Sequence, residues 1–167
     1  LKQQAQRDSL THLYNLEAGK YIIDEYIKKN PKQQNALIVL DIDHFKEVND
    51  TYGHQCGDYI LKQVANSALQ TFRKTDTVFR YGGEEFVVIL TETDIEQSII
   101  PLERFRKTIE TLDLEYQGQK VNITVSIGAC QLNEETSTKE ELLEKADTAL
   151  YKAKNCGRNQ VILNKDL

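Results

Sequence analysis

Apolar residues along the chain recur mostly at intervals of three and four, which is the spacing of helices with one buried face. Asn30-Pro31 and Cys156-Gly157 would end the first and the last of these helices. A shorter helical turn is predicted at residues 45–50. The apolar positions of the four longer segments are Tyr21, Ile22, Tyr26 and Ile27; Leu61, Val64, Ala65, Ala68, Leu69 and Phe72; Ile95, Ile99, Leu102, Phe105, Ile109 and Leu112; and Leu142, Ala146, Ala149, Leu150 and Ala153.

Short β-prone segments between the helices predict the strands of one sheet. Residues 36–40 are apolar throughout, the pattern of a strand buried on both faces. Residues 121–127 alternate strictly between apolar and polar, which predicts a strand with one face in the core. Residues 160–163 would form a closing strand. With a hairpin among the strands, we expect a mixed sheet in a single α/β domain.

The strongest turn signal is Gly82-Gly83, between the β-prone segments 77–81 and 86–90. Only glycine adopts a positive φ at both positions of a two-residue hairpin turn without strain, so we expect a tight turn. Glu84 and Glu85 follow, and adjacent strand residues point to opposite faces, so the two carboxylates would differ in role. Either one of them faces a ligand or both belong to a solvent-facing hairpin, and this stretch alone fits both interpretations.

Composition and charge narrow the class of protein. A chain of 167 residues is long enough for one domain with a full core. No apolar run is long enough to cross a bilayer, and the first residues of the sequence lack the charged-then-apolar pattern of a signal peptide. Cys56, Cys130 and Cys156 form no Cys-x-x-Cys pair, which indicates reduced thiols in a cytoplasmic setting. The net charge of −5 argues against a nucleic-acid polymer as partner, whereas a small anionic ligand is compatible with it.

The first residues predict a connection to a longer protein. The chain begins at Leu1 rather than Met, and residues 1–7 are polar and compatible with the end of a helix. The following residues 8–15 are rich in capping residues and predict a compact turn, with Leu10 and Leu13 pointing inward. We therefore expect a linker helix from an upstream domain at residues 1–7 and the domain itself at residues 8–167.

Carboxylates at the predicted strand ends are the first candidates for chemistry. Asp41 and Asp43 lie where the strand of residues 36–40 ends. If this strand pairs with the hairpin, Asp41 and Glu84 converge at one edge of the sheet. Two carboxylates and a main-chain carbonyl suit Mg²⁺, and the chain lacks the P-loop that would otherwise cradle phosphates. Two interpretations of these residues therefore remain. They could support a metal-assisted displacement at phosphorus, or they could be aspartates that are merely exposed at strand ends.

Five blocks of the sequence resemble the motifs of the GGDEF domain, the diguanylate cyclase family, and they occur in the family's order. The signature is present in its GGEEF form, Gly82-Gly83-Glu84-Glu85-Phe86. The other blocks are Asp8-Ser9-Leu10-Thr11-His12-Leu13-Tyr14-Asn15, residues 41–54, Val125-Ser126-Ile127-Gly128, and residues 146–154 with Gly157-Arg158-Asn159. This resemblance implies an α/β (α+β) fold with a mainly antiparallel five-stranded central sheet wrapped by helices, akin to nucleotidyl cyclases and polymerase palms.

The resemblance also implies a site for GTP and a metal ion. Asp41, the carbonyl of Ile42 and Glu84 would bind Mg²⁺, with Mn²⁺ as a second choice, and Asp41, Glu84 and Glu85 would be catalytic. Glu85 is assigned neither as acid nor as base. The residues implied to bind the substrate are Asn49 and Asp58 for guanine, Lys154 and Arg158 for the terminal phosphates, and Phe45, Lys46, His54 and Gly83 around them.

The activity implied by the resemblance is the condensation of two GTP into cyclic di-GMP and two pyrophosphates. This reaction needs a homodimer, and an upstream sensor would control it, with the domain itself cytoplasmic even where the sensor is anchored in a membrane. Product inhibition would use the RxxD motif formed by Arg73 and Asp76, with Arg104 as a further contact. The alternative for Arg73 and Lys74 is that they complement the carboxyl end of a helix.

Two other functions remain open. The domain could be a catalytically silent receptor that binds GTP or cyclic di-GMP, although each implied metal and base position is present. It could also accept other bases and make a mononucleotide or a mixed dinucleotide. Leu16 and His44 depart from the usual residues of the family, but neither supplies an implied metal ligand. His44 and His54 lack a third histidine or cysteine, so a transition-metal site is not predicted.

Overall fold

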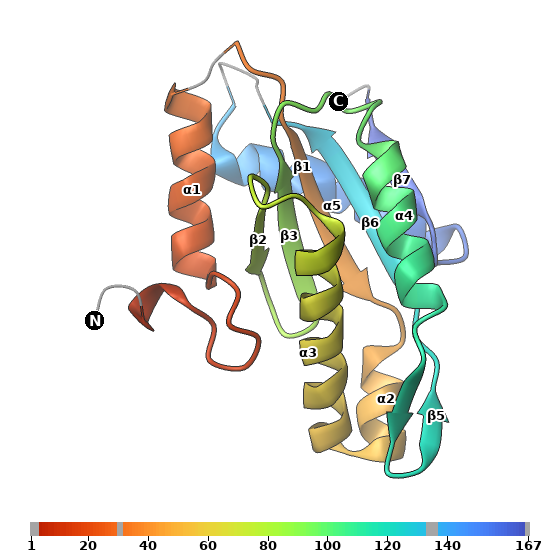
Figure 1. Cartoon of the computed structure of the whole chain (residues 1–167). Helices are drawn as coiled ribbons and strands as arrows, with labels where there is room; N and C mark the ends of the chain where they lie inside the picture. The colour runs from red at the N-terminus through yellow and green to blue at the C-terminus, as the bar shows by residue number, and fades with distance from the viewer. Residues whose placement is uncertain (1–3, 30–31, 133–136, 166–167) are drawn as a thin grey trace.

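The computed structural model describes residues 4–29, 32–132 and 137–165. Helices and strands are interspersed along the chain, and strands from distant segments meet in one central sheet (Figure 1). The elements are the 3-10 helix η1 (Gln4–Gln6), α1 (Leu16–Lys29), β1 (Ala36–Ile42), α2 (Phe45–Tyr52), α3 (His54–Thr71), β2 (Thr77–Arg80), β3 (Glu85–Leu90), α4 (Ile99–Glu110), β4 (Leu114–Tyr116), β5 (Gln119–Val121), β6 (Val125–Gln131), α5 (Lys139–Asn155) and β7 (Val161–Asn164).

The central sheet has five strands in the order β2-β3-β1-β6-β7. β1 lies in the middle and pairs antiparallel with both β3 and β6. β2 pairs antiparallel with β3, whereas β7 runs parallel to β6. The expected mainly antiparallel five-stranded sheet is therefore confirmed.

Helices cover both faces of the sheet, and each face has its own apolar core. Successive residues of β1 point to opposite faces. Ile38 and Leu40 belong to the core formed with α3 and α4, and Leu37 and Val39 belong to the core formed with α1 and α5. Figure 1 shows α3 and α4 in front of the sheet and α5 behind it. Each residue of β1 is buried, which confirms the prediction made from its continuous apolar run.

The loop between β2 and β3 is longer than the predicted two-residue turn. Arg80 pairs with Phe86, and the N–H of Gly82 donates to the carbonyl of Glu85 over 3.3 Å. Among the described residues, the glycines with positive φ do not include Gly82 or Gly83, so the predicted turn type is wrong. The guanidinium of Arg80 donates to the carbonyls of Gly82 at 3.2 Å and Gly83 at 2.8 Å. This side chain fills the loop from inside and holds it open.

The predicted single strand over residues 121–127 is also wrong, because the chain divides there. Val121 ends β5, which forms a separate two-stranded hairpin with β4, and Val125 begins β6. Between them, Thr124 hydrogen-bonds to Asp43 through both its carbonyl and its hydroxyl. β6 is buried on both faces rather than one, since α5 covers the second face.

Two smaller expectations near the helices need correction. Leu69 is 56% exposed, because it lies about 100° around α3 from the buried Ala68, outside the covered stripe. In the turn at residues 8–15, Leu13 is buried as predicted, whereas Leu10 is half-buried. Residues 4–6 form a 3-10 helix, and residues 1–3 lie outside the described part, so the upstream linker helix stays a prediction. None of the described helices is both long enough and apolar enough to span a membrane.

Candidate active site

The pairing of β1 with β3 brings the predicted carboxylates to one end of the sheet. Asp41 faces Glu85 across the two strands. One residue further, the N–H of Ile42 donates to the carbonyl of Glu84 at 3.3 Å. Asp41 is only 5% exposed, because β1 is the middle strand, with Glu85 of β3 opposite Asp41 on one side and Ser126 of β6 opposite it on the other. The predicted convergence of Asp41 and Glu84 therefore follows from strand order.

Asp41 has one oxygen engaged and one without a partner. Its Oδ2 forms an ion pair with the Nζ of Lys154, which comes from the last turn of α5. Its Oδ1 is buried and has no hydrogen-bond partner among the described residues. Burial raises the pKa of Asp41, although the hydrogen bond from Lys154 acts in the opposite direction. A buried acceptor that lacks a partner is costly, so this oxygen suits a ligand.

Glu84 and Glu85 add two more half-buried carboxylates beside Asp41. Burial raises the pKa of both, and the charge of Asp41 raises it further. For Glu85 the charge of Asp147, from the exposed face of α5, acts in the same direction. The side chain of Glu85 lies over Gly82, where an added Cβ would be 3.6 Å from its Oε1. The site thus holds negative charges that disfavour one another.

These groups fit a hard divalent cation. Within the described residues, no three histidine, cysteine, aspartate or glutamate side chains form a ready metal cluster. However, Asp41 and Glu84 offer carboxylate oxygens with raised pKa values, one of them without a partner, and Ile42 lies between them. Oxygen donors of this kind are those that Mg²⁺ and Mn²⁺ take in proteins, and a cation would relieve the repulsion.

The two histidines considered for a transition metal, His44 and His54, occupy the starts of two different helices. His44 precedes α2 in a left-handed conformation, and its Nδ1 is 3.8 Å from Glu47 Oε2. His54 is exposed and is the first residue of α3.

The residues implied to bind guanine lie where α2 and α3 meet. Asn49 is on α2, and its Oδ1 is buried with no partner among the described residues. Gly57 on α3 makes this approach possible, since a Cβ there would be 1.9 Å from Asn49 Oδ1 and 3.1 Å from Phe45 Cζ. Asp58 follows Gly57 and is exposed. Each of the two helices therefore carries one acceptor near their contact, the buried Oδ1 of Asn49 and the exposed carboxylate of Asp58.

The residues implied to bind phosphates come from three segments. Phe45 and Lys46 begin α2, and the first N–H groups of a helix are free to bind anions. Gly83 is exposed in the loop before Glu84. Lys154 contacts Asp41, and Arg158 lies exposed in the turn after α5 with φ of 63°. Lys154 therefore lies at the carboxylates, and Arg158 follows it by four residues along the chain.

The RxxD residues border a cavity of about 370 Å³ together with Arg104. Arg73 Nη2 lies 3.1 Å from Asp76 Oδ1 and donates to the carbonyl of Thr91 at 2.5 Å. The Asp76 side chain is 2% exposed and accepts hydrogen bonds from the N–H groups of Arg73 and Thr91. The Arg73 side chain is still 55% exposed. Arg73 therefore contacts the strand end after β3 and keeps a free face toward the cavity.

Comparison with known proteins decides the family. The family model described as "Diguanylate cyclase, GGDEF domain" matches residues 5–160. The chain belongs to the GGDEF family.

Individual relatives agree with this assignment. The GGDEF domain is 42% identical over 157 residues to diguanylate cyclase A of Treponema denticola. This match covers 94% of this chain and 40% of the relative. It is similar to the crystal structure of the GGDEF domain of DgcB from Caulobacter crescentus in complex with c-di-GMP, with a TM-score of 0.91, 33% identity and 96% of each chain covered. It is also similar to diguanylate cyclase SiaD in complex with its activator SiaC from Pseudomonas aeruginosa, with a TM-score of 0.92, 32% identity, and 97% of this chain and 63% of that chain covered. The chain spans less than half the length of the curated relative from Treponema.

Sequence reasoning about the GGDEF domain missed a buried polar junction beside the site. The sequence predicts Asp43 as a second carboxylate at the strand end. Its oxygens instead accept hydrogen bonds from the hydroxyls of Thr124 and Ser126, both at 2.7 Å, and from the N–H of Asn159 at 3.1 Å. A partial signal was present, since Thr124 and Ser126 place two hydroxyls on alternate positions of a segment that enters the core.

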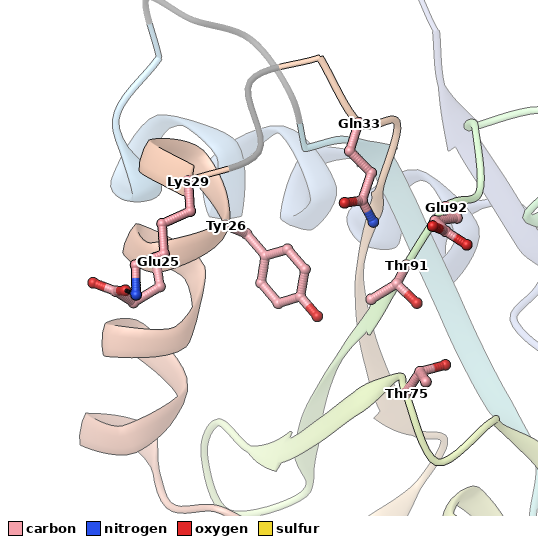
Figure 2. A pocket seen from close by; sticks show the side chains of 7 residues that line it. All are labelled: Glu25, Tyr26, Lys29, Gln33, Thr75, Thr91 and Glu92. Carbon is pink, nitrogen blue, oxygen red and sulfur yellow. Dashed lines mark ion pairs between the residues drawn. The ribbon is translucent and has the colours of Figure 1, made fainter.

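A second cavity, of about 470 Å³, lies outside the predicted site (Figure 2). Glu25, Tyr26 and Lys29 of α1 border it on one side, and Thr75 and Thr91 border it on the other. The ring of Tyr26 projects from α1 toward the side where Thr75 and Thr91 lie. The residues that line this cavity include none of those predicted to bind substrate or metal.

Proposed function

We propose that this GGDEF domain is a diguanylate cyclase, which condenses two GTP molecules into cyclic di-GMP and two pyrophosphates. The observation that carries the proposal is the meeting of Asp41, Glu84 and Lys154 at one end of the sheet. Two carboxylates suit a metal ion on the triphosphate, and a lysine suits its phosphates. Membership of the family supports the same chemistry.

Mg²⁺ or Mn²⁺ would be held by Asp41, the carbonyl of Ile42 and Glu84. When bound, the ion supplies charge that stabilises the phosphates during displacement. Lys154 would leave Asp41 and bind the phosphates, because the carboxylate of Asp41 and the phosphates of GTP compete for its one ammonium group. Arg158 and the N–H groups that open α2 would hold the remaining phosphate oxygens.

Guanine would bind between Asn49 and Asp58. A carboxylate accepts hydrogen bonds, and the guanine edge offers two neighbouring donors, N1–H and the exocyclic amino group. Adenine has no N1–H, so Asp58 would lose one of its two hydrogen bonds to the base in an ATP complex. We therefore infer a preference for GTP.

Each domain would hold one GTP, and two domains would face each other around a two-fold axis. The 3′-oxygen of one GTP forms a bond to the α-phosphorus of the other, while the bond from that phosphorus to the leaving pyrophosphate breaks. The 3′-hydroxyl gives up its proton in this step to a carboxylate of the site or to water. Glu85 lies opposite Asp41, and its raised pKa brings a carboxylate closer to the range useful for proton transfer. An upstream sensor would control the approach of the two domains.

The test is an incubation with GTP and Mg²⁺, followed by chromatography of the products. We expect cyclic di-GMP and pyrophosphate in a ratio of one to two, with a rate per domain that rises with protein concentration because a dimer is required. GTP or cyclic di-GMP binding without turnover, at concentrations where the domain is dimeric, would instead favour the silent receptor. A linear product would contradict the symmetric arrangement.

The RxxD cavity is proposed as the site of product inhibition. Arg73 and Arg104 border it with guanidinium groups, which suit the two phosphates of cyclic di-GMP. Because Asp76 is 2% exposed and already hydrogen-bonded, we assign it to holding Arg73 rather than to contacting the ligand. Bound product would act by favouring an arrangement in which the two active half-sites are apart.

Replacing Arg73 with Ala should abolish product inhibition and leave the initial rate near that of the parent. The substitution removes the phosphate-binding fork and spares Asp41, Glu84 and the guanine contacts. The measurement is the progress curve at saturating GTP, with and without a phosphodiesterase that removes the product. Lys74→Ala, which changes a neighbouring exposed cation, is the matched control and should still slow. Unchanged slowing and unchanged cyclic di-GMP binding in Arg73→Ala would refute this site.

A further inference from the structure

The turn after α5 is tied into the core by a polar junction that has no role in the proposed reaction. The N–H of Asn159 donates to Asp43 Oδ2 at 3.1 Å and to Ser126 Oγ at 3.2 Å. Asp43 is 5% exposed and Ser126 is fully buried. The junction therefore joins the chain just after β1, the start of β6, and the turn that carries Arg158.

The side chain of Asn159 extends this junction to α4. Its Oδ1 accepts a hydrogen bond from Arg106 Nη1 at 2.9 Å, and its Nδ2 donates to Glu110 Oε2 at 2.5 Å. Arg106 is itself fixed, since its side chain is 13% exposed and donates to both oxygens of Glu103 at 3.0 Å. Asn159 is thus clamped on both sides of its amide.

The backbone of this turn needs such support. Arg158 has φ of 63° and Asn159 has φ of 49°, so two successive residues with side chains adopt the left-handed conformation. Each such residue costs about 1–2 kcal/mol, although asparagine tolerates the conformation better than most. The hydrogen bonds of Asn159 stabilise a conformation that the chain would otherwise leave, and Arg158 precedes it directly.

We infer that the side chain of Asn159, held by Arg106 and Glu110, is a positioning element for Arg158 in triphosphate binding. The inference rests on the proposed function, because it needs GTP as the ligand. Asn159 itself contacts no substrate in this role. It fixes the turn before GTP binds. Binding then does not carry the entropy cost of ordering the loop that holds the guanidinium of Arg158.

The deciding experiment is a double-mutant cycle between Asn159→Gly and Arg158→Ala. Glycine keeps the positive φ without strain and keeps the N–H that donates to Asp43, so only the side-chain clamp is lost. Affinity is measured by calorimetry with the α-thio analogue of GTP and Mg²⁺. We expect Asn159→Gly to weaken binding about 10-fold, equivalent to about 1.4 kcal/mol, and to weaken it no further in the Arg158→Ala background.

Two comparisons keep the result specific. Asn159→Gly combined with Asn49→Ala should show additive losses, because the base contact does not act through Arg158. Glu103→Gln, which changes another partner of Arg106 and leaves Asn159 clamped, should bind like the parent. Glu110→Ala removes half of the clamp without touching the turn, and its smaller loss should likewise vanish in the Arg158→Ala background.

The outcomes separate this inference from the proposed function. If Asn159→Gly binds like the parent, or if its loss adds fully to that of Arg158→Ala, the positioning role is overturned while GTP binding stands. If the parent binds no GTP analogue, the proposed function fails and this inference fails with it. Should Asn159→Gly not fold, the Glu110→Ala cycle gives the same decision.

Discussion

Replacing Asp41 with Asn is expected to reduce the formation of cyclic di-GMP by about 100-fold or more while the fold is retained. The amide removes the charge that would hold the metal ion, and loss of several kcal/mol of transition-state stabilisation corresponds to this factor. Folding should be less affected, because burial raises the pKa of Asp41 and a neutral group relieves that penalty. Lys154 loses its partner, which offsets part of the gain.

The measurement is the initial rate of pyrophosphate release at saturating GTP and Mg²⁺, with circular dichroism to check the fold. Glu84→Gln should behave in the same way, since it removes the second proposed metal ligand. Asp113→Asn is the matched control, because Asp113 is exposed and pairs only with Lys120 among the described residues. Turnover close to that of the parent in Asp41→Asn or in Glu84→Gln would remove that carboxylate from the proposed metal site.

Gly128→Ala should destabilise the whole domain. A Cβ at this position of β6 would be 2.2 Å from the N of Leu150 and 2.3 Å from the O of Ala146, both backbone atoms of α5. Backbone atoms cannot rotate aside as a side chain can, so α5 would have to move away from the sheet. Overpacking of this kind costs about 3 kcal/mol or more, which would lower the Tm of a domain of this size by about 6–12 °C.

Thermal unfolding followed by circular dichroism measures this loss, and Gly83→Ala is the control. A Cβ at Gly83 would meet no described atom within 4 Å, and its φ is not positive, so its Tm should match that of the parent. Activity of Gly128→Ala should fall even below its Tm, because α5 carries Lys154. A Tm for Gly128→Ala equal to that of the control would mean that the helix and strand separate at little cost.

The hydrophobic pattern predicted most of the fold because helix and strand periods are local properties of the sequence. It failed where a hydrogen bond from a side chain, near or far in the sequence, determines the backbone. The loop between β2 and β3 is held open by Arg80, and the break before β6 is fixed where Thr124 meets Asp43. Neither contact can be read from the spacing of apolar residues.

The candidate site shows the same division. The convergence of Asp41 and Glu84 could be predicted, because it needs only that β1 and β3 be neighbours. The contact of Asp43 with Asn159 joins residues 116 positions apart, so it could not be predicted from the local hydroxyl pattern at Thr124 and Ser126. The ion pair of Lys154 with Asp41 was not predicted either, since the resemblance assigned the two residues to different ligands.

Because β1 is the central strand, the two proposed metal ligands, Asp41 and Glu84, should differ in how easily their backbone opens locally. β1 has a strand on each edge and helices on each face, so its amide hydrogens should exchange with solvent only when the whole domain unfolds. Glu84 instead lies in the loop between β2 and β3, at the edge of the sheet, where brief local openings are cheaper. We therefore expect Asp41 to stay fixed during fluctuations that carry Glu84 away, so that the site would come apart and reform without unfolding of the domain.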